Sequence, residues 1–297
     1  MNVGVHLPDV PGDLADLDRW RGCLGPRLAL ASVYLAWGAE EPGFDPVAME
    51  ALARRGLTPL VTWEPWRVPQ AGAAPAAQRG YALATIVAGR HDAYVRAWAE
   101  GCRAYGAPVL LRPMHEMNGD WYPWCGTVNG NSAGRYVRAW RHLRRIFAEA
   151  GADNVTWVWC PYVRSYPAGS GNEAAAYFPG DAWVDRVGLD GYNWGDRAPP
   201  HRWESFEALF GPAYRELARL SRRPFLLAEV GCADEGGSKV RWVEEMFAAL
   251  AARFPRVESL VWFQCDKERD WRIDPGLLAR APATRLPGAV SPAAEVS

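Results

Sequence analysis

The sequence predicts an α/β chain that forms a single (β/α)8 barrel, in which eight parallel strands alternate with helices. The first observation is that short apolar runs alternate with amphipathic segments at intervals of roughly 30 to 40 residues. The second is that neither a linker nor an internal repeat divides the 297 residues, a length that fits one such barrel. We therefore expect one domain over residues 1–280 and a disordered tail over 281–297.

The predicted strands are short apolar runs rich in Val, Leu and Trp. Parallel strands in such a barrel are covered on both faces, so their sequences are apolar throughout and do not alternate with polar residues. In chain order they are Val3–His6, Leu28–Leu35, Pro59–Trp63, Val109–Arg112, Val155–Trp159, Val187–Tyr192, Phe225–Glu229 and Ser259–Phe263.

The predicted helices lie between these strands, and each gathers its apolar residues on one face through three- and four-residue spacing. They are Asp13–Leu24, Asp45–Arg55, His91–Tyr105, Ser132–Ala150, Trp203–Arg222 and Lys239–Phe254. Glycine is expected where a helix ends with a positive φ. It follows four of these segments, at Gly25, Gly56, Gly106 and Gly151.

The bulk composition excludes several classes of partner. The formal net charge of −1 leaves no positive excess that would attract a nucleic acid or an anionic membrane. No stretch reaches the ~18 apolar residues of a membrane-spanning helix, and no signal-peptide pattern opens the sequence. We expect a cytoplasmic protein or, if the chain is a domain of a longer exported protein, one outside the cell or in its envelope. The oligomeric state stays open.

The six cysteines contain no C-x-x-C pair, which argues against a zinc ribbon or a thioredoxin-type motif. Buried free thiols are the expected state, because cysteine is among the most buried residue types. Cys125 and Cys160 follow neighbouring predicted strands, so a disulfide between them is geometrically conceivable.

Residues 110–124, with the sequence LLRPMHEMNGDWYPW, carry the most chemical information in the chain. A predicted strand runs directly into Arg, His, Glu and Asn, and then into three aromatic residues. This order suits a cleft that cleaves sugars, which needs a hydrogen-bonded carboxyl and flat rings for pyranose faces. Other predicted strand ends also carry aromatic residues, so we expect a ring of stacking surfaces at the carboxyl-terminal mouth of the barrel.

Two glutamates are the candidate catalytic pair. Glu116 ends the fourth predicted strand and Glu229 ends the seventh. These strands face each other across a barrel mouth, so the two carboxyls would flank one scissile bond. A salt bridge to a helix explains a lone glutamate at a strand end equally well. It does not explain this pair beside His115, Asn118 and Tyr192.

The expected roles follow from the neighbouring residues. Glu116 lies among apolar and aromatic side chains, and partial loss of solvation should raise its pKa towards that of a general acid. Glu229 has to stay ionised as a nucleophile, and Arg112 and Tyr192 are candidate donors to it. His115 is expected to hydrogen-bond a sugar or a carboxylate, because His-Glu-Met-Asn-Gly lacks the second histidine of a zinc motif. We expect no metal and no cofactor.

The segment Arg-Pro-Met-His-Glu-Met-Asn-Gly-Asp-Trp-Tyr-Pro-Trp resembles the signature of family 26 glycoside hydrolases. These are β-mannanases and related endo-β-glycanases, which are retaining (β/α)8 barrels. The resemblance extends to Asp-Gly-Tyr-Asn-Trp at 190–194, to Ala-Glu-Val-Gly at 228–231 and to Trp262. It implies Glu116 as the acid/base and Glu229 as the nucleophile.

The resemblance also implies a set of residues around the substrate. His115, Trp121 and Trp262 would surround the cleaved bond. Asp190 would contact the sugar on the glycone side, and Tyr192 the nucleophile. The expected substrate-binding residues are Arg112, His115, Asn118, Trp121, Trp124, Asp190, Tyr192, Trp194, Trp262, Trp63, Glu64 and Trp66.

One departure from the family pattern concerns the end of the third predicted strand. Mannan-specific members are expected to carry a histidine there, whereas this chain has Trp63-Glu64-Pro65-Trp66. β-Mannan, mixed-linkage β-glucan, β-1,3-xylan and a bacterial exopolysaccharide therefore all stay open as the polysaccharide substrate. Glu64 is expected either to bind a hydroxyl pair on a distal sugar or to pair with an arginine.

The leading hypothesis is a retaining endo-β-glycanase that acts on a β-linked polysaccharide by double displacement. One alternative is a barrel that binds a polysaccharide without cutting it. It is disfavoured because two facing carboxylates would lose solvation without any benefit to binding. Another is a metal-dependent barrel enzyme, which is disfavoured because no His/Asp ligand set is apparent.

Overall fold

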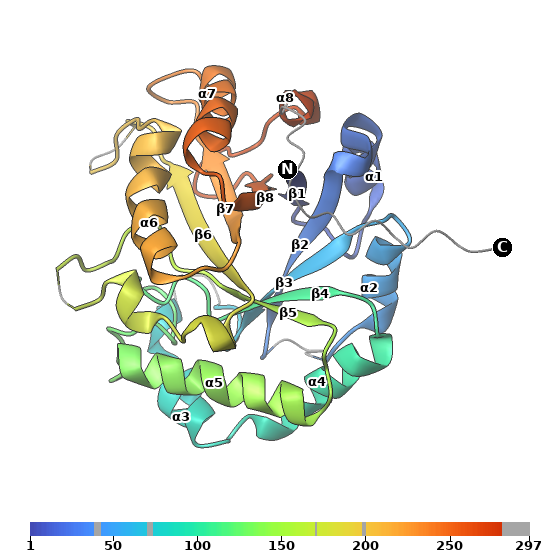
Figure 1. Ribbon diagram of the computed structural model, residues 1–297, viewed down its shortest axis with the longest axis vertical. Coiled ribbons are helices and arrows are strands. Elements are labelled where there is room, and N and C mark those ends of the chain that lie inside the picture. Colours follow the sequence, from blue (N-terminus) through green and yellow to red (C-terminus); the bar gives the residue numbers. More distant parts are fainter. Residues whose placement is uncertain (39–42, 70–73, 170, 198–199, 281–297) are drawn as a thin grey trace.

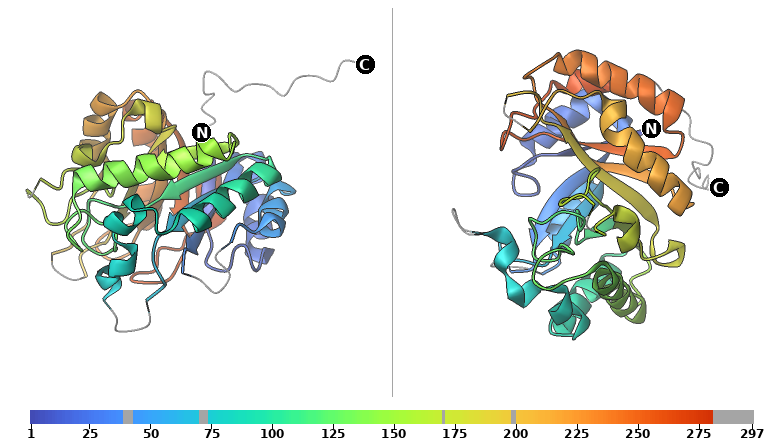
Figure 2. Two further views of the ribbon diagram at one scale, coloured as in Figure 1. Left: turned by 90° about the horizontal axis from the view of Figure 1, so that it is seen from below. Right: turned by 90° about the vertical axis from the view of Figure 1, so that its left-hand side faces the viewer.

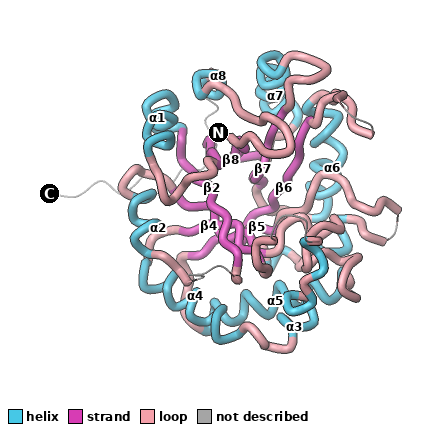
Figure 3. Tube along the Cα trace, turned by 180° about the vertical axis from the view of Figure 1, so that it is seen from behind, coloured by secondary structure: helices cyan, strands magenta, loops and turns pink. Residues whose placement is uncertain are grey.

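The computed structural model confirms the predicted barrel. Eight strands are hydrogen-bonded in the order β1 to β8, and β8 pairs with β1, so the sheet closes on itself. The helices lie outside the ring of strands, as Figure 1 and the reverse view in Figure 3 show. The structure describes residues 1–38, 43–69, 74–169, 171–197 and 200–280.

Every predicted strand is present, and only the ends differ from the expected ones. The strands are β1 (Asn2–His6), β2 (Leu28–Ala36), β3 (Thr58–Glu64), β4 (Val109–Pro113), β5 (Val155–Trp159), β6 (Arg186–Asn193), β7 (Phe225–Cys232) and β8 (Val257–Phe263). The largest extension is in β7, which continues past Glu229 to Cys232. Glu229 therefore lies inside a strand, where its backbone is fixed on both sides.

The α-helices are α1 (Ala15–Leu24), α2 (Pro46–Ala53), α3 (Leu83–Val87), α4 (Asp92–Tyr105), α5 (Ala133–Glu149), α6 (Phe206–Leu220), α7 (Lys239–Arg253) and α8 (Pro275–Ala279). All six predicted helices are found. The short helices α3 and α8 were not predicted, because about one turn is too short to show a periodic pattern. The long green helix α5 runs along the outside of the strands in Figure 2.

Local sequence signals explain where the helices begin and end. Ser132, Ser205 and Ser238 cap the N-termini of α5, α6 and α7, each accepting a hydrogen bond from a backbone N–H three residues on. The four glycines expected at helix ends have a positive φ, which confirms that prediction. They are Gly25, Gly56, Gly106 and Gly151.

Two apolar layers hold the barrel together. A small interior cluster fills the centre, and a much larger layer lies between the strands and the helices. The interior cluster consists of Leu30, Leu60, Leu110, Val158, Cys160, Leu226, Ala228 and Val261. A filled interior makes the barrel a rigid support for the side chains at its mouth.

All six cysteines are free thiols, so the conceivable disulfide between Cys125 and Cys160 does not form, although both side chains are buried. Within the described ranges, no helix is both long and apolar enough to cross a membrane. The tail expected over 281–297 lies outside the described residues.

Candidate active site

A cavity of about 450 Å³ opens at the carboxyl-terminal ends of the strands, and both Glu116 and Glu229 line it. The sequence placed these two residues on opposite strands of one barrel mouth, and the structure brings them to one cavity. Most of the remaining wall is aromatic. The aromatic lining residues are Tyr34, Trp66, Trp121, Tyr122, Tyr162, Tyr166, Tyr192, Trp194, Phe263 and Trp271.

Glu229 is held by a buried ion-pair network that spans three strands. In the pairing of β6 with β7, Asp190 lies opposite Glu229, directly after a register shift at Leu189. Such an irregularity redirects side chains beside a site. Arg112 on β4 reaches both acids, with Nη1 at 2.6 Å from Asp190 Oδ2 and Nη2 at 2.6 Å from Glu229 Oε1. One guanidinium thus fixes the two carboxylates relative to each other.

Two tyrosine hydroxyls complete the surroundings of Glu229. Tyr34 donates a hydrogen bond of 2.5 Å to Oε1, and Tyr192 donates one to Oε2. Burial alone would raise the pKa of Glu229, but the positive charge of Arg112 and these hydrogen bonds lower the pKa to about 2. Glu229 is therefore ionised at neutral pH, and the expectation that Arg112 and Tyr192 donate to it is confirmed.

Glu116 occupies a different setting, in the turn that follows β4. Its φ is 51° and that of Met114 is 50°. This left-handed region is uncommon for residues other than glycine, and such conformations concentrate at functional sites. The indole N–H of Trp121 donates to Glu116 Oε2 over 2.7 Å. Burial and the nearby negative charge of Glu229 nevertheless raise the pKa of Glu116 well above its usual value.

The surroundings of the two carboxyls of the cavity therefore shift their pKa values in opposite directions. A protonated carboxyl can give a proton to a leaving oxygen, and an ionised one can attack a carbon or stabilise positive charge on it. Cleavage of a glycosidic bond requires one carboxyl of each kind. Substrate would enter along the aromatic walls, whose ring faces suit pyranose rings.

Three tryptophans expected to stack against sugars are instead part of the core. The side chains of Trp63, Trp124 and Trp262 are fully buried. Their indole N–H groups donate to the Tyr94 hydroxyl and to the carbonyls of His115 and Trp271 respectively. A ring without exposed surface has no face for a ligand, so this part of the expectation is corrected. Trp63 packs against Trp98 of α4 and Phe147 of α5, and Trp262 packs against Trp242 of α7. Trp124 packs instead against Tyr122 and His115 in the segment after β4.

Three polar residues of the expected set also act within the protein. Arg112 and Asp190 have no exposed side-chain surface and bind each other. A direct contact between Asp190 and a sugar is therefore corrected to an indirect role through Arg112. Asn118 is buried as well, and its amide exchanges two hydrogen bonds of 2.9 Å with the backbone of Tyr162. It joins the turn after β4 to the segment after β5.

His115, Glu64 and Trp66 follow or end β3 and β4, and of the three only Trp66 lines the cavity, whereas His115 and Glu64 are buried. Burial and the charge of Arg112 lower the pKa of His115 to about 3, so its ring is neutral. Trp66 lines the cavity, and its indole donates a hydrogen bond of 3.1 Å to Glu64, so Glu64 is bound by an indole and not by an arginine. Burial raises the pKa of Glu64 to about 8, so this acid is protonated at neutral pH.

Sequence reasoning missed several lining residues. Tyr34 stands near the end of β2, among the strand-end aromatic residues expected around the barrel mouth, but it was not assigned to the substrate-binding set. Tyr162 and Tyr166 lie in the long segment after β5, and Trp271 lies in the segment after β8. No periodic pattern marks such segments, so sequence alone offers little to place their side chains.

A metal ion would find unsuitable ligands here. In the part of the chain that the structure describes, one candidate group brings ligand atoms of His115, Glu116 and Asp190 within 4.8 Å of one another. Both oxygens of Asp190 already accept hydrogen bonds from the Arg112 guanidinium, at 2.7 and 2.6 Å. A cation would have to displace this buried positive charge, so the donor set does not fit a metal.

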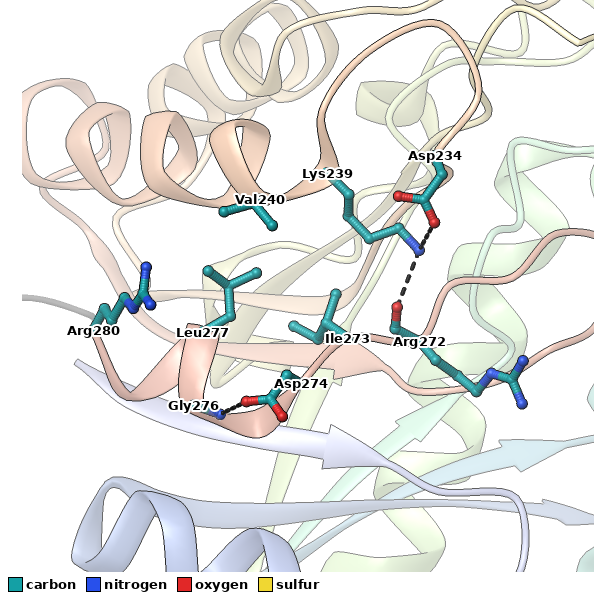
Figure 4. Close-up of a pocket in the computed structure, with 9 residues that line it drawn as sticks. All are labelled: Asp234, Lys239, Val240, Arg272, Ile273, Asp274, Gly276, Leu277 and Arg280. Atoms are coloured by element: carbon teal, nitrogen blue, oxygen red, sulfur yellow. Dashed lines mark hydrogen bonds and ion pairs between the residues drawn. The ribbon is translucent and has the colours of Figure 1, made fainter.

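A second cavity, of about 460 Å³, lies at the start of α7, next to residues 272–280 (Figure 4). The amino group of Lys239 points to Asp234, at 3.1 Å, and donates to the carbonyls of Asp270 and Arg272 at 2.7 and 3.0 Å. All three of its donors are thus engaged in holding the chain segment. This cavity has no pair of buried carboxyls, and the candidate active site is the one at the barrel mouth.

Comparison with known sequences agrees with this site. Residues 86–225 match the model of Glycosyl hydrolase family 26. The chain is 34% identical over 279 residues to Endoglucanase H of Acetivibrio thermocellus, covering 92% of this chain and 29% of that protein. It is 30% identical over 164 residues to Mannan endo-1,4-beta-mannosidase A and B of Caldalkalibacillus mannanilyticus, covering 53% and 28%. The chain thus spans less than a third of each of these relatives.

Solved structures share the fold at lower sequence identity. The family 26 domain of an endo-beta-mannanase/endo-beta-glucanase from Prevotella bryantii superposes with a TM-score of 0.68 at 16% identity, covering 95% of this chain and 88% of that one. A Cellulomonas fimi endo-beta-1,4-mannanase double mutant gives 0.68 at 20% identity, covering 94% and 69%. These likenesses establish the barrel and not the substrate.

Proposed function

Since this chain belongs to glycosyl hydrolase family 26, we propose that it is a retaining endo-β-glycanase. In the first step Glu116 protonates the leaving oxygen while Glu229 attacks the anomeric carbon and forms a glycosyl-enzyme. In the second step the Glu116 carboxylate takes a proton from a water molecule, which attacks the same carbon and releases Glu229. The cycle ends with Glu116 protonated and Glu229 ionised, as it began.

One observation carries this proposal. The two buried carboxyls of one cavity have pKa values shifted in opposite directions, upward for Glu116 and downward for Glu229. Pairs of titratable groups whose environments separate their pKa values are typical of acid and base assignments in enzymes. A module that only bound a glycan would gain nothing from this separation. The proposed catalytic domain is residues 1–280.

We propose a β-glucan as the substrate and β-mannan as the second candidate. The relative named an endoglucanase matches 92% of this chain, whereas the mannosidases of Caldalkalibacillus mannanilyticus and Bacillus subtilis match 53% or less. The third strand also ends in Glu64 where a mannan-specific histidine is expected. Glu64 does not itself line the cavity, but its partner Trp66 does, so the pair would contribute to sugar recognition through the Trp66 ring.

The test is a product assay on β-mannan, glucomannan, mixed-linkage β-glucan, β-1,3-xylan and carboxymethylcellulose. Wild type and Glu229→Ala are assayed side by side, and the anomeric form of the first product is followed by NMR. We expect wild type to cut mixed-linkage β-glucan with retention and Glu229→Ala to cut none of the polymers. Inversion of the product, or turnover that survives in the variant, would refute the mechanism.

A further inference from the structure

Three aromatic rings gather on the Glu116 side of the cavity, and we call Trp121, Tyr162 and Tyr166 the acid-side cluster. Trp121 donates to Glu116, and its ring centroid lies 5.6 Å from that of Tyr162 and 5.7 Å from that of Tyr166. All three residues line the cavity. The proposed chemistry uses Trp121 through its hydrogen bond but assigns nothing to the two tyrosines.

The position of the acid fixes which part of a substrate would meet this cluster. A general acid protonates the oxygen that leaves, so the departing sugars lie on its side of the cleaved bond. The nucleophile instead bonds to the sugar that stays. The acid-side cluster is joined to Glu116, whereas Glu229 is surrounded by Tyr34, Arg112 and Tyr192. Its rings therefore border the path of the departing chain.

We propose that Tyr162 and Tyr166 bind the sugars on the leaving-group side of the cleaved bond, in an inference that rests on the proposed function. Tyr166 is 42% exposed, among the few large apolar side chains with that much surface. An exposed tyrosine alone needs no explanation. This one lines the cavity beside the acid, where a pyranose ring can lie against it. The same site then binds the acceptor when a sugar replaces water in the second step.

The backbone that carries the two tyrosines is fixed by buried amides. Tyr166 N–H donates to the carbonyl of Asn118 over 2.8 Å. The Asn172 amide donates to the carbonyls of Asn118 and Tyr166 over 2.7 and 2.8 Å. Both asparagines are only 1% exposed. Buried amides with several partners hold a segment in one shape, and a preformed site loses less entropy when a ligand binds.

A bidentate ion pair connects the segment that carries the two tyrosines to the segment before α6. Arg164 Nη1 and Nη2 donate to the two oxygens of Glu204 over 2.8 and 2.6 Å. Glu204 belongs to the segment before α6. In addition, the Tyr162 hydroxyl accepts a hydrogen bond of 3.3 Å from the Trp194 indole. Arg164 and Glu204 do not line the cavity, so they are positioning residues for the wall that carries Tyr162 and Tyr166.

The first experiment compares wild type with Tyr166→Ala on two substrates, mixed-linkage β-glucan and 2,4-dinitrophenyl β-cellobioside. The aryl group needs little help from leaving-group subsites, whereas the polymer uses them. We expect kcat/KM on the polymer to fall about ten-fold and that on the aryl glycoside to fall clearly less. With cellotetraose as the acceptor, we also expect the ratio of sugar transfer to hydrolysis to fall. Leu220→Ala, an exposed apolar side chain at the end of α6, is the matched control.

The second experiment is a charge swap at the ion pair. We expect Arg164→Glu to raise the KM for the polymer several-fold with little change in kcat, and the double variant Arg164→Glu with Glu204→Arg to recover much of the loss. A general loss of folding would instead lower kcat on both substrates to the same extent.

The outcomes separate this inference from the proposed function. Equal losses on polymer and aryl glycoside in Tyr166→Ala, or an unchanged transfer ratio, overturn the leaving-group role while the glycosidase mechanism stands. A wild type that cuts neither the polymers of the panel nor their aryl glycosides overturns both. If wild type cuts β-mannan instead, the same comparison is made with mannan, an aryl β-mannobioside and mannotetraose.

Discussion

The two sides of the cavity bury their carboxyls almost equally but shift the pKa values of these carboxyls in opposite directions. Glu229 is 5% exposed and Glu116 is 6% exposed. On the nucleophile side, donors from β2, β4 and β6 converge on Glu229 and keep it ionised. On the acid side, Glu116 accepts a hydrogen bond from the indole of Trp121, and its pKa is raised.

Burial does not by itself decide the charge of an acid. Loss of solvation raises the pKa of both glutamates, and the number and charge of the donors then decide the result. Removal of one hydrogen-bond partner or of one carboxyl should change or abolish this contrast between the pKa values of Glu229 and Glu116.

The largest effect is expected from Glu229→Ala. Without the nucleophile no glycosyl-enzyme can form, and turnover should fall by several orders of magnitude on every substrate. Initial rates on the polymer measure this loss, and a thermal melt checks that the barrel is intact. Glu235→Ala, which alters a partly exposed glutamate just beyond β7, should keep the wild-type rate. A slow Glu235→Ala together with a fast Glu229→Ala would reverse the assignment.

Glu116→Ala should slow polymer cleavage by roughly 10²- to 10⁴-fold, because a poor leaving group needs its proton. A dinitrophenyl glycoside needs no such help, so its bond should still break and release a burst of phenolate. Azide should then accelerate turnover by replacing the water that Glu116 no longer activates. A variant equally impaired on both substrates, and indifferent to azide, would show that Glu116 is not the acid/base.

Tyr192→Phe should lower kcat/KM by about 10- to 100-fold, as expected for one hydrogen bond to a charged group. The Tyr192 hydroxyl stabilises the ionised form of Glu229. Without this donor the pKa of Glu229 should rise from about 2. The acidic limb of the pH profile, which marks ionisation of the nucleophile, should therefore move to higher pH. Tyr105→Phe serves as the control, because its hydroxyl binds the Met49 carbonyl away from the cavity.

The smallest effect is expected from Trp121→Phe. This change removes the indole donor, which stabilises the ionised form of Glu116, so the pKa of Glu116 should rise further. The alkaline limb of kcat/KM against pH marks loss of the acid's proton and should move upward, with only a severalfold change in the maximal rate. An alkaline limb that moves downward would mean that Trp121 supports the neutral carboxyl.

The fold was predictable because the barrel repeats one simple signal. Apolar runs located the strands, three- and four-residue spacing with glycines at four ends located the helices, and the facing ends of the fourth and seventh strands gave the candidate catalytic pair, with which the family resemblance agrees. The opposing pKa shifts were also foreseeable in direction. For Glu229, the charged partner Arg112 lies on a strand predicted to meet the same barrel mouth.

The aromatic residues were predictable only in part. Strands buried on both faces lack an alternating pattern, so the sequence does not reveal whether a tryptophan faces the cavity or the surrounding helices. Trp63 and Trp262 were therefore expected at the substrate but lie in the core, whereas Trp271 lines the cavity. Tyr162 and Tyr166 were missed because their position depends on buried amides that only the folded chain brings together.

Arg112 also sets a condition on how the chain becomes native. Its guanidinium connects β4, in the first half of the barrel, with Asp190 and Glu229 on β6 and β7 in the second half. A buried guanidinium without its carboxylate partners is strongly unfavourable, and so are the carboxylates without it. Arg112 in the first half and the two carboxylates in the second half therefore depend on each other for burial. The ion pairs around Glu229 therefore need residues from both halves of the closed barrel.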